Sequence, residues 1–428
     1  MTLQSIWHRF VDPVTRNWLI HFSGNLGRLA LGMVSSVLIA RALSPDLFGA
    51  YILLGAVSSI GLAVANMGLP RAAVQQIAAV WEHDPGLARQ RGRVFFGLQV
   101  VGATAVLLLL VMLIPILADS LLSIERYLVS IVLVGVLAMV LSGTMNSLLQ
   151  ATGQFGRLSF NLLLNSGLTS LLAIWLFWRG QLTLINALLI LGVATSLVSF
   201  VVGYWLLPPA LKAAQSPLPW QPESTSLLRL SRWFWLSSLL AILATRADIL
   251  LIGRLSESST VGWYGLAANL AAKAEMINHS LYAVLLPAAA AIQNPNQLHR
   301  YLTQSTRRGL LVCVGLLLAL VVAQPLIPLF YGAAYDTAVP FFRWLLLLVM
   351  VDVITTPFLL LAFAFDRPHL ITLNDALRLT VLVPLTFWFL PTYGAMGIIG
   401  AKFIAQIIAV SLTLVLLWRK RPYLTPAK

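Results

Sequence analysis

Charged side chains occur inside segments that are otherwise apolar enough to span a lipid bilayer. The cations are Arg28, Arg246, Lys273, Arg378 and Lys402. The acids are Asp248, Glu275, Asp352 and Asp375. Each charge at the centre of a membrane helix costs about 2.5–3.5 kcal/mol on insertion scales, so together they would exceed the ~5–15 kcal/mol that stabilises a typical fold. They must therefore pair or line a hydrated cavity, and the excess of cations indicates an anionic ligand.

The composition is that of a polytopic helical membrane protein. The chain has 428 residues, of which 59% are hydrophobic and 10% charged, whereas a soluble domain carries about 25% charged residues. Most of its 28 Lys and Arg residues fall in the two terminal segments and the even-numbered loops, which predicts that both termini are cytoplasmic. This asymmetry accounts for the net charge of +14 without a nucleic-acid partner. The single Cys313 excludes an intrachain disulfide.

Twelve spans are expected in an all-α fold, because apolar runs long enough to cross a bilayer recur along the whole chain. We place them at 18–40, 47–69, 94–117, 128–150, 158–178, 182–207, 230–253, 261–287, 307–330, 340–365, 370–391 and 395–418. The predicted organisation is a cytoplasmic N-terminus (1–17), a six-helix bundle (18–207), a cytoplasmic Pro-rich linker (208–229), a second six-helix bundle (230–418) and a basic cytoplasmic C-terminus (419–428).

The two predicted bundles share a short motif. An arginine at the end of the first span is followed by a glycine and a tyrosine, and the same three residue types recur 213 positions later at the end of the seventh span. The two sets are Arg41, Gly49 and Tyr51, and Arg254, Gly262 and Tyr264. Because each half has six spans, the repeat is parallel, and such repeats place a substrate site near the midplane between the halves.

The same motif carries a family resemblance. The segment from Leu38 to Tyr51 (LIARALSPDLFGAY) resembles the opening motif of the polysaccharide transporter, or oligosaccharide flippase, family. The segments Asp248–Gly253 and Val261–Ala267 resemble its seventh and eighth helices. The family is part of the multidrug/oligosaccharidyl-lipid/polysaccharide exporter superfamily. The resemblance implies a V-shaped two-bundle fold with a central cavity and no enzymatic activity.

The function implied by the resemblance is transport of a lipid-linked sugar. A polyprenyl-pyrophosphate-linked oligosaccharide would move from the cytoplasmic to the outer leaflet of the bacterial plasma (inner) membrane, for polysaccharide or lipopolysaccharide (O-antigen) biosynthesis. Partners implied are the substrate, the membrane, and polysaccharide polymerase and chain-length proteins. No cofactor is implied apart from coupling to H⁺ or Na⁺.

Five residues are predicted to line the cavity, namely Asn25, Arg28, Arg246, Lys273 and Lys402. Asn25 and Arg28 share a helix face because they are three residues apart. A guanidinium group suits a phosphate because its donors form a rigid fork. For Arg28 the alternative is a buried ion pair with an acid of the other half. For Arg246 and Lys402 it is structural pairing between helices, and for Lys273 it is a hydrogen-bonded structural pair.

The acids have two interpretations, ion coupling and structural pairing. The candidates for ion coupling are Asp248, Glu275, His279 and Asp352. Glu275 and His279 are four apart, so a hydrogen-bonded structural pair is the alternative for them. Asp375 and Arg378 are three apart, and we expect them to form a local structural ion pair.

Several activities are not expected. The sequence contains no Walker-type phosphate loop, no dinucleotide fingerprint and no spaced His/Cys metal cluster. The predicted outer loops are short, which argues against a membrane glycosyltransferase or polymerase. The alternative to a flippase is a multidrug or metabolite cation antiporter of the same superfamily, which would use Asp248, Glu275 and Asp352.

Overall fold

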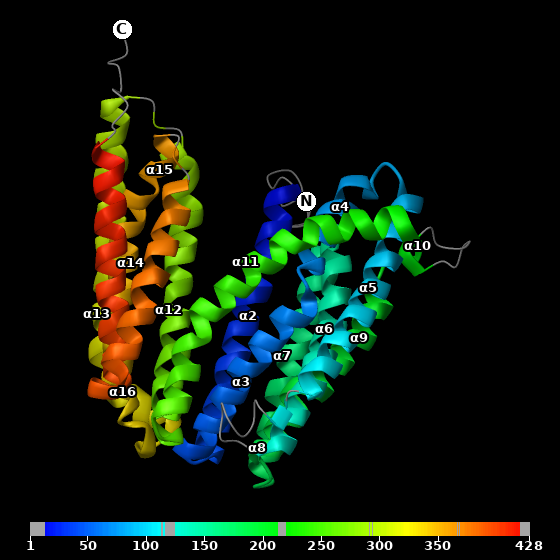
Figure 1. The fold of residues 1–428 in the computed structure, drawn as a ribbon, viewed down its shortest axis with the longest axis horizontal. Helices are drawn as coiled ribbons and strands as arrows, with labels where there is room; N and C mark the ends of the chain where they lie inside the picture. Colours follow the sequence, from blue (N-terminus) through cyan, green and yellow to red (C-terminus); the bar gives the residue numbers. More distant parts are fainter. Residues whose placement is uncertain are drawn as a thin grey trace, which may run out of the picture. The chain divides into compact units, whose positions relative to one another are not determined.

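The computed structural model describes residues 13–112, 114–115, 125–212, 220–290, 292, 294–365, 367 and 369–419. The regular elements of this part of the chain are all helices (Figure 1). The predicted cytoplasmic segments 1–17 and 419–428 lie mostly outside the described residues. The prediction of an all-α fold is confirmed.

Contacts divide the chain into two compact units, Met1–Leu250 (unit 1) and Leu251–Lys428 (unit 2). The division lies within one long helix, after the predicted linker 208–229. Residues 209–212 and 220–229 of that linker are helical, and 213–219 lie outside the described residues. The predicted bundle bounds remain a prediction.

The helices that begin in unit 1 differ widely in length. They are α2 (Pro13–Ala42), α3 (Pro45–Asn66), α4 (Leu69–Trp81), α5 (Pro85–Met112), α6 (Arg126–Ala151), α7 (Phe155–Trp178), α8 (Leu184–Leu188), the π-helix η2 (Leu189–Ala194), α9 (Thr195–Leu206), α10 (Pro209–Lys212) and α11 (Trp220–Leu255). Apolar side chains of α4, α5, α6 and α11 form a shared core that includes Ile77, Phe95, Leu149 and Leu227. This core attaches the first half of α11 to unit 1.

Unit 2 consists of α12 (Ser258–Ala290), α13 (Pro295–Tyr331), the 3-10 helix η3 (Ala333–Tyr335), α14 (Ala338–Leu359), α15 (Leu361–Ala364) and α16 (His369–Arg419). The helix α16 is interrupted at Gly394, whose φ of 58° and ψ of −148° are not helical. A Cβ on Gly397 would lie 2.7 Å from the carbonyl carbon of Phe389, although residues eight apart in a straight helix are about 12 Å apart. The chain therefore folds back within α16.

The helices agree with the predicted spans. Ten helical segments of the described residues are long and apolar enough to cross a membrane. One of the ten is α16, which contains the two predicted spans 370–391 and 395–418 on either side of Gly394. The predicted span 261–287 corresponds to α12, which is long enough but carries Lys273 and Glu275 at its centre.

A short helix was not expected after the second span. We predicted that this span ends at residue 69 and that a loop follows, but α3 ends at Asn66 and α4 begins at Leu69. Met67 and Gly68 between them have φ angles of 49° and 69°. This left-handed pair turns the chain, and Ala72, Ala73 and Ile77 of α4 are then buried.

Small residues bring α2 and α7 close together in unit 1. A Cβ on Gly24 would lie 2.9 Å from the Cβ of Ser159. Further along, the hydroxyls of Ser35 and Ser170 are 2.9 Å apart. The partners differ by the same number of positions at both points, so the helices run parallel. Close packing over small residues is a usual way for membrane helices to associate, because lipid provides no hydrophobic driving force.

Candidate functional site

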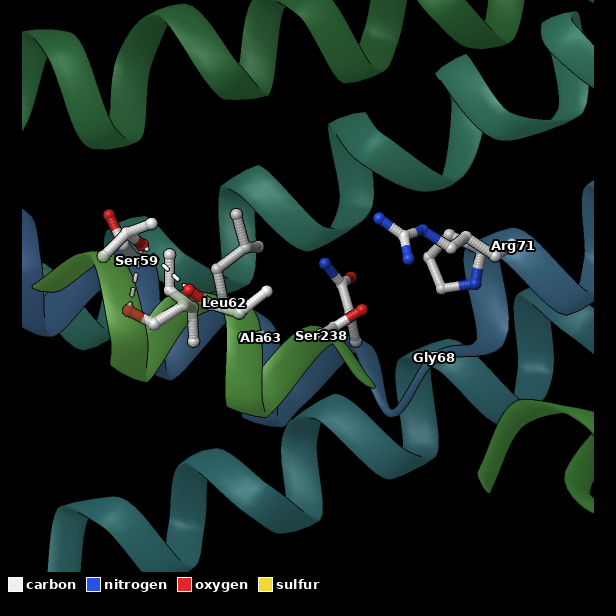
Figure 2. Close-up of a pocket in the computed structure, with 11 residues that line it drawn as sticks. Ser59, Leu62, Ala63, Gly68, Arg71 and Ser238 are labelled. Carbon is white, nitrogen blue, oxygen red and sulfur yellow. Dashed lines mark hydrogen bonds between the residues drawn. The ribbon is translucent and has the colours of Figure 1, made fainter. Parts of the chain in front are cut away.

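A cavity of about 430 Å³ lies within unit 1. Its volume is in the range of roughly 300–1,000 Å³ that is usual for ligand pockets. The side chains that line it come from α3, α4 and α11 and the turn between α3 and α4 (Figure 2). They are Ser59, Leu62, Ala63, Asn66, Gly68, Pro70, Arg71, Ser238, Ala241, Ile242 and Thr245.

Two helices each present one stripe of residues to this cavity. The stripe of α3 is Ser59, Leu62, Ala63 and Asn66, and the stripe of α11 is Ser238, Ala241, Ile242 and Thr245. Both follow the spacing i, i+3, i+4, i+7, which is one face of an α-helix. Each stripe has polar residues at its ends and apolar residues between them.

Gly68 fixes the register between these two stripes. A Cβ at this position would lie 2.5 Å from the backbone nitrogen of Trp235 and would also overlap the carbonyl oxygen of Ser231. The turn after α3 therefore touches α11 one helical turn before Ser238. Asn66, two residues before Gly68, therefore lies at the end of the cavity near Arg71. Figure 2 shows Ser238 closer to Arg71 than Ser59 is, and Ser59 marks the other end.

The Arg71 end of the cavity offers hydrogen-bond donors. Arg71 is the one charged residue among the described residues that line the cavity, and its guanidinium group points into it (Figure 2). Neither Arg71, Asn66 nor Ser238 forms a hydrogen bond within the described part of the chain. A guanidinium has five N–H donors, an amide two and a hydroxyl one, so this end can bind an anion.

The other end offers hydrogen-bond acceptors. The hydroxyl of Ser59 donates to the carbonyl of Gly55 at 2.8 Å. The hydroxyl of Thr245 donates to the carbonyl of Ala241 at 3.1 Å. Because both protons are used within the helices, the two oxygens present lone pairs that can accept hydrogen bonds from hydroxyl groups of a ligand.

A polar cluster holds α11 against α4 and α5 beside the cavity. Arg91 Nε forms an ion pair with Glu223 Oε2 at 2.8 Å, and the two side chains are only 20% and 15% exposed. Arg91 Nη1 also donates to the carbonyl of Gln76 at 2.9 Å, and Gln76 Nε2 donates to Ser226 Oγ at 2.9 Å. We call these four residues the Arg91 cluster. It positions the start of α11, on which one wall of the cavity depends.

Two of the predicted cavity cations lie on two helices of unit 1, Arg28 from the first predicted bundle and Arg246 from the second. On α2, Asn25 is half-buried and Arg28 is exposed. On α11, Arg246 is half-buried and Asp248 is buried, with its carboxylate accepting a hydrogen bond from the Ile249 nitrogen at 2.8 Å. Neither Arg28 nor Arg246 forms an ion pair within the described residues. Both interpretations of these two arginines, cavity lining and a buried ion pair with the other half, remain predictions.

The other two predicted cavity cations, Lys273 and Lys402, are half-buried in unit 2. Lys273 Nζ is 3.5 Å from the carbonyl oxygen of Asn269, one turn earlier in α12. Lys402 Nζ donates to the hydroxyl of the buried Tyr264 at 2.9 Å. It also lies 5.6 Å from the centre of the Tyr264 ring. Both lysines thus have polar contacts inside their own unit, and a cavity shared with Arg28 and Arg246 remains a prediction.

Acidic residues gather around Asp352 in unit 2. The amide of Gln406 donates a hydrogen bond to its carboxylate. Asp352 is also within electrostatic range of Arg378, Glu275 and Asp375. The structure thus brings together residues of α12, α14 and α16 that are far apart in the sequence. Three carboxylates near one arginine form a local excess of negative charge.

Two expected pairs have different outcomes. Asp375 and Arg378 do not form an ion pair within the described part of the chain. A spacing of three residues places both on one side of the helix, but Asp375 is exposed, and Arg378 is close enough to Asp352 for their charges to interact. The side chain of His279 lies outside the described side chains, so its pairing with Glu275 remains a prediction.

Several cavity residues were not predicted from the sequence. Arg71 belongs to the cations of the even-numbered loops, and neither Asn66 nor Ser238 was singled out. A usable signal was present, because two helices carry polar residues seven positions apart, Ser59 with Asn66 and Ser238 with Thr245. That spacing returns to the same helix face after two turns. What the sequence could not indicate is that these two faces meet.

Comparison with solved structures shows which proteins share this fold. The fold is similar to the inward-facing conformation of a multidrug resistance MATE family transporter of the MOP superfamily, with a TM-score of 0.71, 14% identity, and coverage of 93% of this chain and 96% of that one. It is also similar to the lipid II flippase MurJ in an inward closed conformation, with a TM-score of 0.70, 14% identity, and coverage of 94% and 88%.

A third similar structure is a MOP superfamily transporter from Pyrococcus furiosus, with a TM-score of 0.58, 15% identity, and coverage of 98% of this chain and 100% of that one. No curated protein sequence matches this chain. The chain therefore has the fold of the MOP-superfamily transporters, a class of multi-pass membrane proteins.

The family follows from the sequence itself. Residues 38–340 match the family described as "Polysaccharide biosynthesis protein". This match covers most of the chain, and the protein belongs to that family. This match confirms the resemblance to the polysaccharide transporter and flippase family, which the motif at the end of the first span carries.

Proposed function

We propose that the protein is a flippase, and not an enzyme, that moves a polyprenyl-pyrophosphate-linked oligosaccharide from the cytoplasmic to the outer leaflet of a bacterial inner membrane. One observation carries this proposal: a member of a polysaccharide biosynthesis family has the fold of transporters and of a lipid flippase. The product would enter polysaccharide or O-antigen synthesis, with a polymerase and chain-length proteins as partners.

Cations in the spans would compensate for the ligand's loss of hydration. A pyrophosphate that leaves water must replace its hydration by charge-assisted hydrogen bonds. Arg28 and Arg246 have no ion-pair partner among the described residues, so both are available to an anion. Lys273 and Lys402 supply two further positive charges. We propose that transport proceeds by alternating access through this cationic cavity, a mechanism that an internal parallel repeat allows.

Ion coupling would use the acids. We propose that H⁺ or Na⁺ binding in unit 2 involves Asp352 and Glu275, which are close enough for their charges to interact. Asp248 is a further candidate because it is buried within a span. No other cofactor is required for this mechanism.

Gene deletion tests the function directly. Lipid-linked oligosaccharides would be extracted from the membrane of a deletion strain and profiled by mass spectrometry. We expect a completed lipid-linked repeat to accumulate on the cytoplasmic side while the surface glycan is lost. An unchanged lipid-linked pool with an intact surface glycan would refute the flippase.

Substitutions test the role of the span cations in the same strain. Arg28→Ala and Lys273→Ala should abolish surface glycan without lowering the amount of protein in the membrane. Arg300→Ala is the matched control, because this arginine is exposed near the start of α13 and outside the predicted spans. Full export by both span variants would contradict the role of these cations.

A cation antiporter is the alternative, and the charge distribution of unit 2 favours it. Asp352, Glu275 and Asp375 would suit a cationic drug or metabolite better than a pyrophosphate. In that case the deletion strain would show new drug sensitivity and a normal lipid-linked pool, and Asp352→Asn would reproduce the sensitivity.

A further inference from the structure

We propose that the cavity between α3, α4 and α11 is a loading site that binds the substrate head group in one orientation, with its phosphate at Arg71 and its first sugar at Ser59 and Thr245. The ligand class is a phosphate ester that carries a neutral, hydroxyl-rich group. None of the midspan cations predicted from the sequence lines this cavity, although Arg246 directly follows Thr245 on α11, and the inference rests on the proposed function.

The charge of the lining selects an anion. Among the described residues that line the cavity, Arg71 is charged and there is no carboxylate. A cation in this cavity would meet an uncompensated positive charge, whereas a phosphate would gain charge-assisted hydrogen bonds, which are about twice as strong as neutral ones. The planar fork of the guanidinium also matches two phosphate oxygens at once.

The donors at this end are available to a ligand. Asn66 and Ser238 are half-buried and, like Arg71, form no hydrogen bond within the described residues. Half-buried polar groups without partners are the groups that a bound ligand would satisfy. Together they can surround a phosphate from α3, α11 and the first turn of α4.

The two ends of the cavity differ in what they offer. From Asn66 to Ser59, and from Ser238 to Thr245, each stripe rises by about 10 Å. Donors lie at one end, and the oxygens of Ser59 and Thr245 accept at the other. A phosphate needs donors, whereas sugar hydroxyls can give protons to acceptors. The order of the groups therefore specifies the direction in which the head group binds.

The predicted topology places this cavity on the loading side. The loop after the second span, which contains Arg71, is predicted to be cytoplasmic from the distribution of Lys and Arg. The donor end of the cavity, with Arg71, Asn66 and Ser238, is then its cytoplasmic end. A lipid-linked sugar made in the cytoplasmic leaflet would therefore meet the donors of this site first.

Binding measurements with purified full-length protein in lipid nanodiscs test the inference. The probes are polyprenyl pyrophosphate and polyprenyl pyrophosphate linked to one N-acetylhexosamine. Arg71→Gln should weaken both probes at least tenfold, as expected for lost hydrogen bonds to a charged group. Arg232→Gln is the matched control: this exposed arginine stacks on Trp233, does not line the cavity, and should leave both affinities unchanged.

The orientation has its own test. The double variant Ser59→Ala/Thr245→Val should weaken the sugar-linked probe severalfold and leave the sugar-free probe unchanged. The proposed orientation would be overturned if the double variant weakened the binding of both probes equally, or weakened the binding of neither. Wild-type affinity of Arg71→Gln for both probes would overturn the site.

Phospholipid is the other source of phosphate at a membrane protein. Phosphatidylglycerol added to the nanodiscs should not compete with the lipid-linked probes. If it competes equally and Arg71→Gln removes this competition, the cavity binds phospholipid head groups and our assignment is wrong. If Arg71→Gln binds both probes and exports glycan normally while Arg28→Ala stops export, the loading-site proposal is wrong and the flippase proposal is retained. The flippase itself fails only if gene deletion leaves the lipid-linked pool unchanged.

Discussion

At the residue scale, one amide determines how the carboxylate of Asp352 is held. Gln406 is only 2% exposed, and its Nε2 donates to Asp352. We expect Gln406→Leu to destabilise the protein by about 1–3 kcal/mol, because a carboxylate oxygen inside the bundle loses its donor. Thermal unfolding of the purified variant in detergent measures this loss as a lower midpoint temperature.

The double variant with Asp352→Asn controls for lost packing of the glutamine. If the amide acts through the carboxylate, the effects of the two substitutions should not add, with a coupling of about 0.5–3 kcal/mol. Additive effects would show that Gln406 contributes by packing alone.

Candidate residues were easier to name from the sequence than the contacts between them. The cost of charge in a membrane was sufficient to single out Arg28, Lys273 and Asp352. Helical spacing suggested a pair between Asp375 and Arg378 that the structure does not form. The contact between Gln406 and Asp352 joins two helices 54 positions apart in the sequence, and spacing within one helix carries no information about such contacts.

At the scale of the element, Gly68 determines where α4 starts and how closely α11 approaches. Gly68→Ala should cost about 1–2 kcal/mol for the left-handed backbone alone. The added Cβ would in addition push α11 away, since it would lie 2.5 Å from the Trp235 nitrogen. We therefore expect a lower midpoint of thermal unfolding and weaker binding of the lipid-linked probe.

Gly153→Ala is the matched control for Gly68→Ala. Gly153 has a similar φ of 70°, but a Cβ there would meet no atom within 4 Å. It should show the backbone cost without the loss of binding. Equal loss of binding in both variants would contradict the role of close packing at Gly68.

The Arg91 cluster gives a second prediction for α11. Arg91→Glu and Glu223→Arg should each lower the unfolding midpoint and weaken probe binding, because like charges would then face each other across 2.8 Å. The exchange of both residues restores opposite charges, so the double variant should recover much of the loss, with a coupling of about 0.5–3 kcal/mol. No recovery would mean that the Arg91 contact with the Gln76 carbonyl dominates.

Elements defined by apolar length were predictable, whereas short elements and sharp turns were not. The spans 370–391 and 395–418 were predicted as two from their apolar length, and Gly394, where α16 is interrupted, lies between them. The helix α4 was missed because its thirteen residues are too short for a span. Recognising it from the sequence would depend on its buried face, which is formed by Ala72, Ala73 and Ile77. Small alanines give only a weak apolar signal there.

At the scale of the whole molecule, the excess of Lys and Arg in one set of loops predicts the orientation in the membrane. The single cysteine, Cys313, is buried, so Cys313→Ala provides a chain without thiols at little cost in volume. In this background His83→Cys lies between α4 and α5, and Thr337→Cys precedes α14; both positions are exposed.

A membrane-impermeant maleimide then distinguishes the two faces of the membrane. In intact spheroplasts we expect the reagent to label Thr337→Cys, whose loop is predicted to be external, and to label His83→Cys only after the membrane is permeabilised. The chain without thiols should not be labelled in either condition. The reverse pattern would place Arg71 and its cavity on the outer side, where a lipid-linked sugar arrives only after transport. The cavity would then serve release of the head group and not its loading. The leaflet that faces the donor end decides whether the head group binds there before or after transport.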